Sequence, residues 1–151
     1  MIISDSTTLI ILGDLKKLDL LAVFEKVYIP RKVYEEITFK NDIKLPEFIE
    51  IIETPKNDLL SNLKRILDEG ESEAITLAVE KNLPLIIDEK KGRKIAKNFS
   101  IEIIGLLGVL FLNYKKCSLS KKEIEKFLDT ALSNGYGISE QLLKQFFENI
   151  D

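Results

Sequence analysis

The chain has 151 residues, a formal net charge of −3 and no histidine. Without histidine, Ser/His/Asp triads, histidine general bases and the common zinc sites are excluded, so any chemistry must use carboxylates, hydroxyls, lysines or a bound ion. The length fits one domain, 1–151, with a core of its own. The single cysteine excludes an internal disulfide and favours a cytoplasmic protein. The negative net charge argues against a large basic surface that binds nucleic acid. The most apolar stretch, Ile103 to Leu112, is too short to span a bilayer, so we expect no membrane partner.

The first half of the chain alternates short apolar strands with helices. An apolar start stops abruptly at Asp5, which is typical of a buried strand that ends at a polar cleft. We expect helices at Thr8–Leu15 and Leu18–Phe24, a strand at Val27–Ile29, a helix from Pro30 through Ile37, a loop at Asn41–Pro46, a strand at Phe48–Ile52 and a helix at Leu59–Leu67.

The second half continues this alternation and then becomes helical. We expect Gly70 to separate the preceding helix from one that runs through Ala78, followed by a strand at Leu85–Ile87, a helix from Asp88, a strand at Ile101–Ile104, a helix at Gly105–Asn113 and two closing helices at Lys121–Leu132 and Ser139–Phe147. Alternating strands and helices predict an α/β fold in three layers, α/β/α, with a mainly parallel central sheet. Residues 1–115 would form the core, and residues 116–151 a C-terminal helical extension.

Four acidic residues share one position relative to these elements. Each lies at the end of a strand or on the helix just beyond it: Asp5, Glu36, Glu71 and Asp88. Right-handed crossovers bring the carboxyl ends of parallel strands to one edge of the sheet, so we expect the four carboxylates to converge. Converging carboxylates repel, and a hard divalent cation such as Mg²⁺ or Mn²⁺ relieves that repulsion. The pattern therefore predicts a metal site suited to phosphodiester hydrolysis.

Each acid also has an ordinary structural explanation. Asp5 and Asp88 are typical helix caps, and Glu36 and Glu71 are typical acids of a helix surface or first turn. Taken one at a time, these explanations compete with the metal site. It is the recurrence of acids at strand ends, in a chain without histidine, that favours the metal site.

Two glutamates compete for the third acidic position. Counting by three and four residues places Glu71 with Ala74 and Ala78 on the apolar face of its helix, whereas Glu73 falls nearer solvent. We therefore expect Glu71 to point inward.

Four motifs in this order resemble the PIN-domain proteins, metal-dependent ribonucleases that include the VapC-type toxins of toxin–antitoxin pairs. The motifs are Ile2-Ile3-Ser4-Asp5-Ser6-Thr7, Ile29-Pro30-Arg31-Lys32-Val33-Tyr34-Glu35-Glu36-Ile37, Gly70-Glu71-Ser72-Glu73-Ala74-Ile75-Thr76-Leu77-Ala78 and Leu85-Ile86-Ile87-Asp88-Glu89-Lys90-Lys91-Gly92-Arg93-Lys94-Ile95-Ala96. The resemblance covers about residues 1–115 and is greatest to a poorly characterised PIN-like branch with this glycine-rich helix start. It implies a PIN-like fold.

The resemblance also implies which residues form the site. The four acids of the family fall on Asp5, Glu36, Glu71 and Asp88 as catalytic residues, and Asp5, Glu71 and Asp88 would bind Mg²⁺ or Mn²⁺. The family usually has Asp in the third position, so Glu73 is an alternate for Glu71; Glu89, adjacent to Asp88, is an alternate for the fourth. Ser6 or Thr7 matches the hydroxyl that accompanies the first acid.

Basic residues follow the fourth acid. Lys90, Lys91, Arg93 and Lys94 lie within about one turn of the expected metal, and Lys90 and Arg93 are our candidates for contacts to substrate phosphates. A solvated helix face explains the same run equally well.

Three functions are compatible with this pattern. The first is a Mg²⁺- or Mn²⁺-dependent endoribonuclease with RNA as substrate; the resemblance adds a toxin role, with an antitoxin protein and a homodimer as partners. The second is a non-catalytic PIN-like module that binds RNA or a protein. The third is a phosphohydrolase, but haloacid-dehalogenase-like enzymes need a second Asp two residues after the first, where Thr7 stands.

Overall fold

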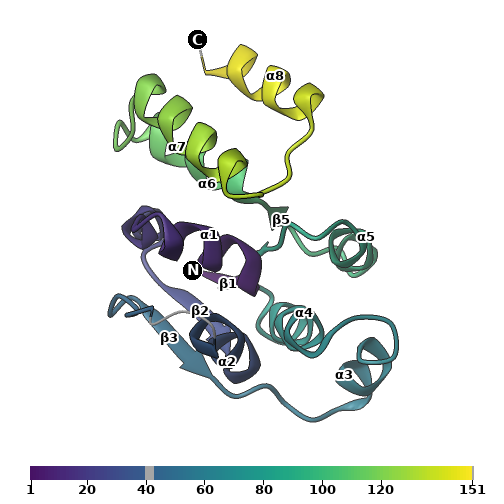
Figure 1. Cartoon of the computed structure of the whole chain (residues 1–151). Helices are drawn as coiled ribbons and strands as arrows, with labels where there is room; N and C mark the ends of the chain where they lie inside the picture. Colours follow the sequence, from purple (N-terminus) through teal and green to yellow (C-terminus); the bar gives the residue numbers. More distant parts are fainter. Residues whose placement is uncertain (40–42, 151) are drawn as a thin grey trace.

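Five short parallel strands form the sheet in the part of the chain that the structure, a computed structural model, describes: residues 1–39 and 43–150. The expected loop at 41–46 begins outside these ranges. The strands lie in the order β3-β2-β1-β4-β5 (Figure 1). They are β1 (Ile2–Ser4), β2 (Val27–Pro30), β3 (Ile49–Ile52), β4 (Leu85–Ile86) and β5 (Ile103–Ile104).

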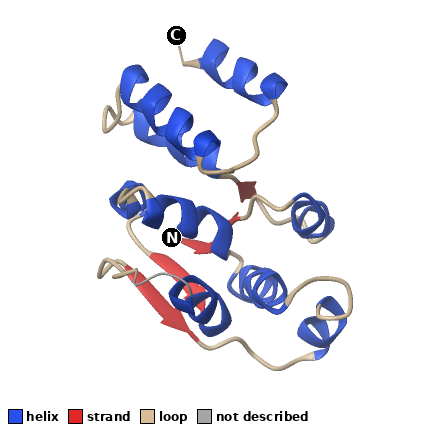
Figure 2. Cartoon of the chain, viewed as in Figure 1, coloured by secondary structure: helices blue, strands red, loops and turns tan. Residues whose placement is uncertain are grey.

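Helices cover both faces of the sheet, as Figure 2 shows. They are α1 (Ser6–Asp14), the 3₁₀ helix η1 (Leu18–Phe24), α2 (Arg31–Phe39), α3 (Asp58–Leu63), α4 (Glu69–Lys81), α5 (Lys90–Asn98), α6 (Leu106–Lys115), α7 (Lys121–Ser133) and α8 (Glu140–Asn149). Successive residues of β1 point to opposite faces. Ile2 joins a core with α1, α2 and α6, and Ile3 joins a second core with α3, α4 and α5. The predicted three-layer α/β/α fold is confirmed.

The strand order places the ends of β1 and β4 at a special point of the sheet. From β1 the chain adds β2 and β3 on one side, and it then crosses over to add β4 and β5 on the other. In open parallel sheets, ligands bind outside the carboxyl ends of the strands where the order reverses in this way. Asp5 directly follows β1, and Asp88 lies two residues after β4.

Several predicted boundaries were wrong, for local reasons. Pro30 ends β2 and does not start a helix; it pairs with Ile52 of β3, beyond the part of β2 that pairs with β1. Gly70 does not separate two helices but lies in the first turn of α4, whose N-cap is Asp68. The expected helix at Leu59–Leu67 is shorter, since α3 ends at Leu63.

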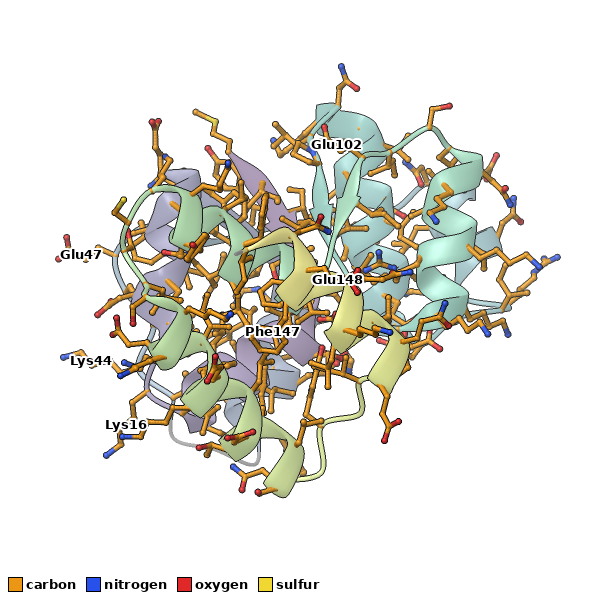
Figure 3. The ribbon with its side chains drawn as sticks, turned by 90° about the horizontal axis from the view of Figure 1, so that it is seen from above. Lys16, Lys44, Glu47, Glu102, Phe147 and Glu148 are labelled. Carbon is orange, nitrogen blue, oxygen red and sulfur yellow. The ribbon has the colours of Figure 1, made fainter. Side chains whose placement is uncertain are left out.

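The C-terminal extension packs on the core. Phe127, Leu128 and Phe146 are buried in the larger of the two hydrophobic cores, and Phe147 packs against it. Figure 3 looks down on this side, with α8 and Phe147 across the middle of the molecule and Lys44, Glu47 and Glu102 at its rim. None of the helices in the described ranges has both the length and the apolar character that a membrane span needs.

Candidate metal centre

Asp5 is a buried carboxylate at the carboxyl end of the central strand. Its backbone N–H donates to the Ile86 carbonyl at 2.9 Å, which fixes the residue between β1 and β4. It occupies the N-cap position of α1, yet its side chain makes no capping hydrogen bond. The residue is 3 % exposed, and Oδ1 has no hydrogen-bond partner among the described residues. Capping, the ordinary explanation of this aspartate, therefore does not account for it.

Burial raises the pKa of Asp5 to about 7 from an ordinary value of 3.8. A hydrogen bond from the backbone of Ser6 opposes that rise, and the neighbouring carboxylates of Asp68, Glu36 and Asp88 add to it. This carboxylate is buried, has an unpartnered oxygen and is surrounded by like charges. A cation or a proton would neutralise its charge.

Glu36 approaches from α2 and lies against the first turn of α4. Desolvation raises its pKa, a hydrogen bond from the Ser6 side chain lowers it, and the charge of Asp68 raises it again. The carboxylate packs directly over Gly70, where an added Cβ would overlap Glu36 Oε1. Gly70 therefore provides the space that Glu36 occupies.

We expect the Gly70→Ala variant to displace Glu36 while the fold is kept. The overlapping atom is the end of a flexible side chain, and alanine is favoured over glycine within a helix by about 1 kcal/mol, so the free energy of unfolding should change little or increase. The stabilisation of the protein by Mn²⁺, measured as a shift in melting temperature, should fall. Gly137→Ala is the matched control, because a Cβ there meets nothing within 4 Å. An unchanged Mn²⁺ shift in Gly70→Ala would contradict the role of Glu36.

Glu71 points inward from the first turn of α4, as its helical position predicted, and is 8 % exposed. Desolvation, followed by a hydrogen bond to the Asp68 side chain and the charges of Asp68, Asp5 and Glu89, raises its pKa to about 8. Two carboxyl groups that share a hydrogen bond need a proton between them. The structure thus brings together four acids: Asp5, Glu36, Asp68 and Glu71.

Asp68 is the member of this group that the sequence analysis missed. It caps α4 by accepting the Glu71 backbone N–H at 2.8 Å, and its charge acts on Asp5, Glu36 and Glu71. The signal was present, because Asp68 precedes Glu71 by three residues, the spacing of a capping box. That signal indicates a helix start, however, and gives no reason to place the same carboxylate at a site.

Asp88 lies beside this group but is held by donors of its own. The backbone N–H of Leu106 donates to Oδ1 at 3.1 Å, and the hydroxyl of Thr8 donates to Oδ2. Burial raises the pKa of the Tyr136 phenol, and the charge of Asp88 raises it further. Asp88 does not cap the helix that follows it, because Glu89 does so by accepting from the Gly92 N–H at 2.8 Å.

The two alternates lie in different surroundings. Glu73 accepts a hydrogen bond from the Thr54 hydroxyl at 3.0 Å, which directs it toward the segment after β3. Glu89 stays close to the acids: a Cβ on Gly92 would lie 3.0 Å from Glu71 Oε2 and 3.6 Å from Glu89 Oε2. Of the two hydroxyls expected beside the first acid, Ser6 interacts with Glu36. A third hydroxyl, that of Thr8, was not expected and donates to Asp88.

Basic side chains flank the acids on two sides. On α5, Lys90 is exposed, and Arg93 donates from Nη1 to the Ile87 carbonyl at 2.9 Å, beside Asp88. On the other side, Lys32 lies 3.7 Å from Glu69 at the border of a groove of about 370 Å³. The groove is lined by four cations, Arg31, Lys32, Lys56 and Lys64, and by four acids, Glu35, Glu53, Glu69 and Glu73, so its charges balance.

The donor set fits a hard divalent cation. All the groups are oxygens, one of them is buried without a partner, and burial together with mutual repulsion raises the pKa values of Asp5, Glu36 and Glu71. As the side chains stand, no three acidic groups of the described residues are arranged to hold an ion together. Mg²⁺ needs only one or two direct carboxylates and takes its other ligands from water, so the acids present suffice.

Comparisons with known proteins agree with this architecture. A family model described as PIN domain matches residues 1–151, which includes the C-terminal extension. The structure is similar to that of a PilT N-terminus domain protein from the hyperthermophilic archaeon Sulfolobus solfataricus, with a TM-score of 0.51 and 22% identity over 73% of this chain and 91% of that chain. No curated protein matched. PIN domains have a nuclease-type fold and typically use divalent metals. On the match of the family model over the whole chain, this protein belongs to the PIN-domain family.

Proposed function

We propose that this protein is a Mg²⁺- or Mn²⁺-dependent endoribonuclease. The observation that supports the proposal best is the unpartnered, buried Oδ1 of Asp5 among acids that come from α2 and α4. Structural carboxylates are normally satisfied by hydrogen bonds, and a buried one that is not satisfied is a common mark of a functional site. The more specific role of a toxin, with an antitoxin or a second copy as partner, rests on the family resemblance alone.

In this proposal the acidic residues bind the cation and the basic residues bind the RNA. Asp5, Glu36, Asp68 and Glu71 would hold the cation, with Asp88 beside them. When bound, a divalent cation supplies a hydroxide nucleophile at neutral pH and neutralises charge on the phosphate. Lys90 and Arg93 on α5 would contact the phosphates of an RNA strand that crosses the acids.

A pair of glutamates on the same helix tests the proposal. Glu71→Gln should lower Mn²⁺-dependent cleavage of a single-stranded RNA by at least about 100-fold, because a ligand of the cation is lost. Glu73→Gln is the matched control, two residues away on the same helix but bonded to Thr54, and it should cleave as the wild type does. Equal activity of the two variants would contradict the proposed site. A wild-type protein that binds the RNA with no Mn²⁺-dependent cleavage would instead indicate a binding module.

A further inference from the structure

A threonine in the first turn of α1 holds one oxygen of Asp88. The Thr8 side chain is buried, and its hydroxyl donates to Asp88 Oδ2, 80 residues further along the chain. Threonines within helices commonly donate back to the carbonyl four residues earlier, as Thr38 and Thr76 do here. The carbonyl four residues before Thr8 is that of Ser4, which belongs to β1 and not to the helix. The hydroxyl of Thr8 is therefore available to a distant acceptor.

The other oxygen of Asp88 is held at the start of α6. The Leu106 N–H donates to Oδ1 at 3.1 Å, and Gly105, the N-cap of α6, has no side chain with which to cap the helix. A Cβ on Gly105 would overlap Oδ1, so this glycine leaves the space from which Asp88 caps α6. The carboxylate is thus held by two donors from different helices, α1 and α6.

The bond from Thr8 crosses the part of the sheet where the acids gather. Asp5 directly precedes α1, and Asp88 lies two residues after β4, the strand that pairs with β1. Because Thr8 follows Asp5 by only three residues, its bond to Asp88 ties together the two acids that follow these neighbouring strands. A valine at position 8 would have almost the same shape but no donor, and Asp88 Oδ2 would lose this hydrogen bond.

We propose that Thr8 is a positioning residue, which orients the Asp88 carboxylate beside Asp5 at the candidate metal centre. The proposal rests on the proposed function in that Asp88 would serve the cation. The family resemblance assigns the accompanying hydroxyl to Ser6 or Thr7, so this role of Thr8 is separate from that match. Removing a partner that orients a metal-binding carboxylate typically lowers metal affinity by about 10-fold to 100-fold. Thr8 should therefore affect metal affinity through Asp88.

The test compares Thr8→Val with Thr8→Ser in the full-length chain, and Thr76→Val is the matched control. Thr76 is also buried in a helix, but its hydroxyl donates to the Ser72 carbonyl of its own helix. Mn²⁺ affinity, measured by titration calorimetry, should be about 10-fold weaker in Thr8→Val and unchanged in Thr8→Ser, which keeps the donor, and in Thr76→Val. Wild-type affinity in Thr8→Val, or an equal loss in either of the other variants, would overturn the proposal.

A second measurement without metal separates this proposal from the function itself. Leu106 is the first residue of α6, so its N–H has no partner within the helix and is bonded to Asp88 Oδ1. Exchange of this amide, followed by NMR, therefore reports how firmly Asp88 is held. We expect it to be about 10-fold faster in Thr8→Val than in Thr76→Val, and to return to the wild-type rate in Thr8→Ser.

The two measurements fail in different ways. Should wild-type protein bind no Mn²⁺, the proposed function fails, and faster exchange in Thr8→Val still supports the positioning role. Equal exchange in Thr8→Val and Thr76→Val would refute that role whatever the metal does. Should Thr8→Val not fold, Thr8→Ala takes its place, because alanine also lacks the hydroxyl and is the best helix former.

Discussion

Replacing Asp5 by Asn is expected to abolish metal-dependent cleavage and, in metal-free protein at pH 8, to raise the melting temperature. The two effects have one cause. Asp5 is buried with an unpartnered oxygen and has neighbouring carboxylates, so its charge destabilises the metal-free fold and is relieved when a cation binds. Asparagine keeps the shape of the side chain and removes the charge.

The loss of cleavage in Asp5→Asn should be large, and an exposed aspartate provides the control. Cleavage of single-stranded RNA should fall by at least about 100-fold, and the shift in melting temperature on adding Mn²⁺ should be lost, because a ligand is removed. Asp129→Asn changes the net charge equally at an exposed position on α7 and should alter neither. A variant with Asn at position 5 that was less stable without metal and still active would show that Asp5 serves the fold and not the site.

Much of the site was predictable because two simple patterns determine it. Asp5 follows an apolar strand, and Glu71 lies at helical spacing with buried alanines, so strand topology and helix periodicity placed both correctly at one edge of the sheet. The position of Glu36 was predictable because α2 follows β2 directly. These residues are fixed by contacts close in sequence or by the order of the strands.

The residues that were missed depend on contacts that sequence patterns do not carry. Asp68 has the sequence context of an ordinary helix cap and does cap α4, so nothing in that context predicts that its charge also acts on Asp5. Tyr136 packs against the core because the extension folds back over it, an arrangement decided by the packing of residues such as Phe146. Pairings of this kind become visible only when the tertiary structure is known.

Metal-free protein should lose stability as the pH rises from about 4 to about 8, with Mn²⁺ reversing the loss at the upper end. The folded pKa values of Asp5 and Glu71, about 7 and about 8, lie above their ordinary values of 3.8 and 4.5. The folded protein therefore retains protons that the unfolded chain releases. The stability that these groups contribute is fully present below the unfolded pKa values and is lost as the pH rises through the folded ones.

One unit of pKa shift corresponds to about 1.4 kcal/mol, so the raised pKa of the buried Asp5 alone accounts for several kcal/mol. In a chain of this length that is a fall in Tm of at least about 5 °C between pH 5 and pH 8. The slope is measured by thermal unfolding in a chelator, and Asp5→Asn should flatten it while Asp129→Asn should not. Ordinary surface carboxylates act in the opposite direction, since pairing lowers their pKa and makes proteins more stable as the pH rises above 4. A wild-type Tm that held level or rose across this range would mean that the acids are not repelling one another, and the electrostatic reason for a cation at this edge of the sheet would be gone.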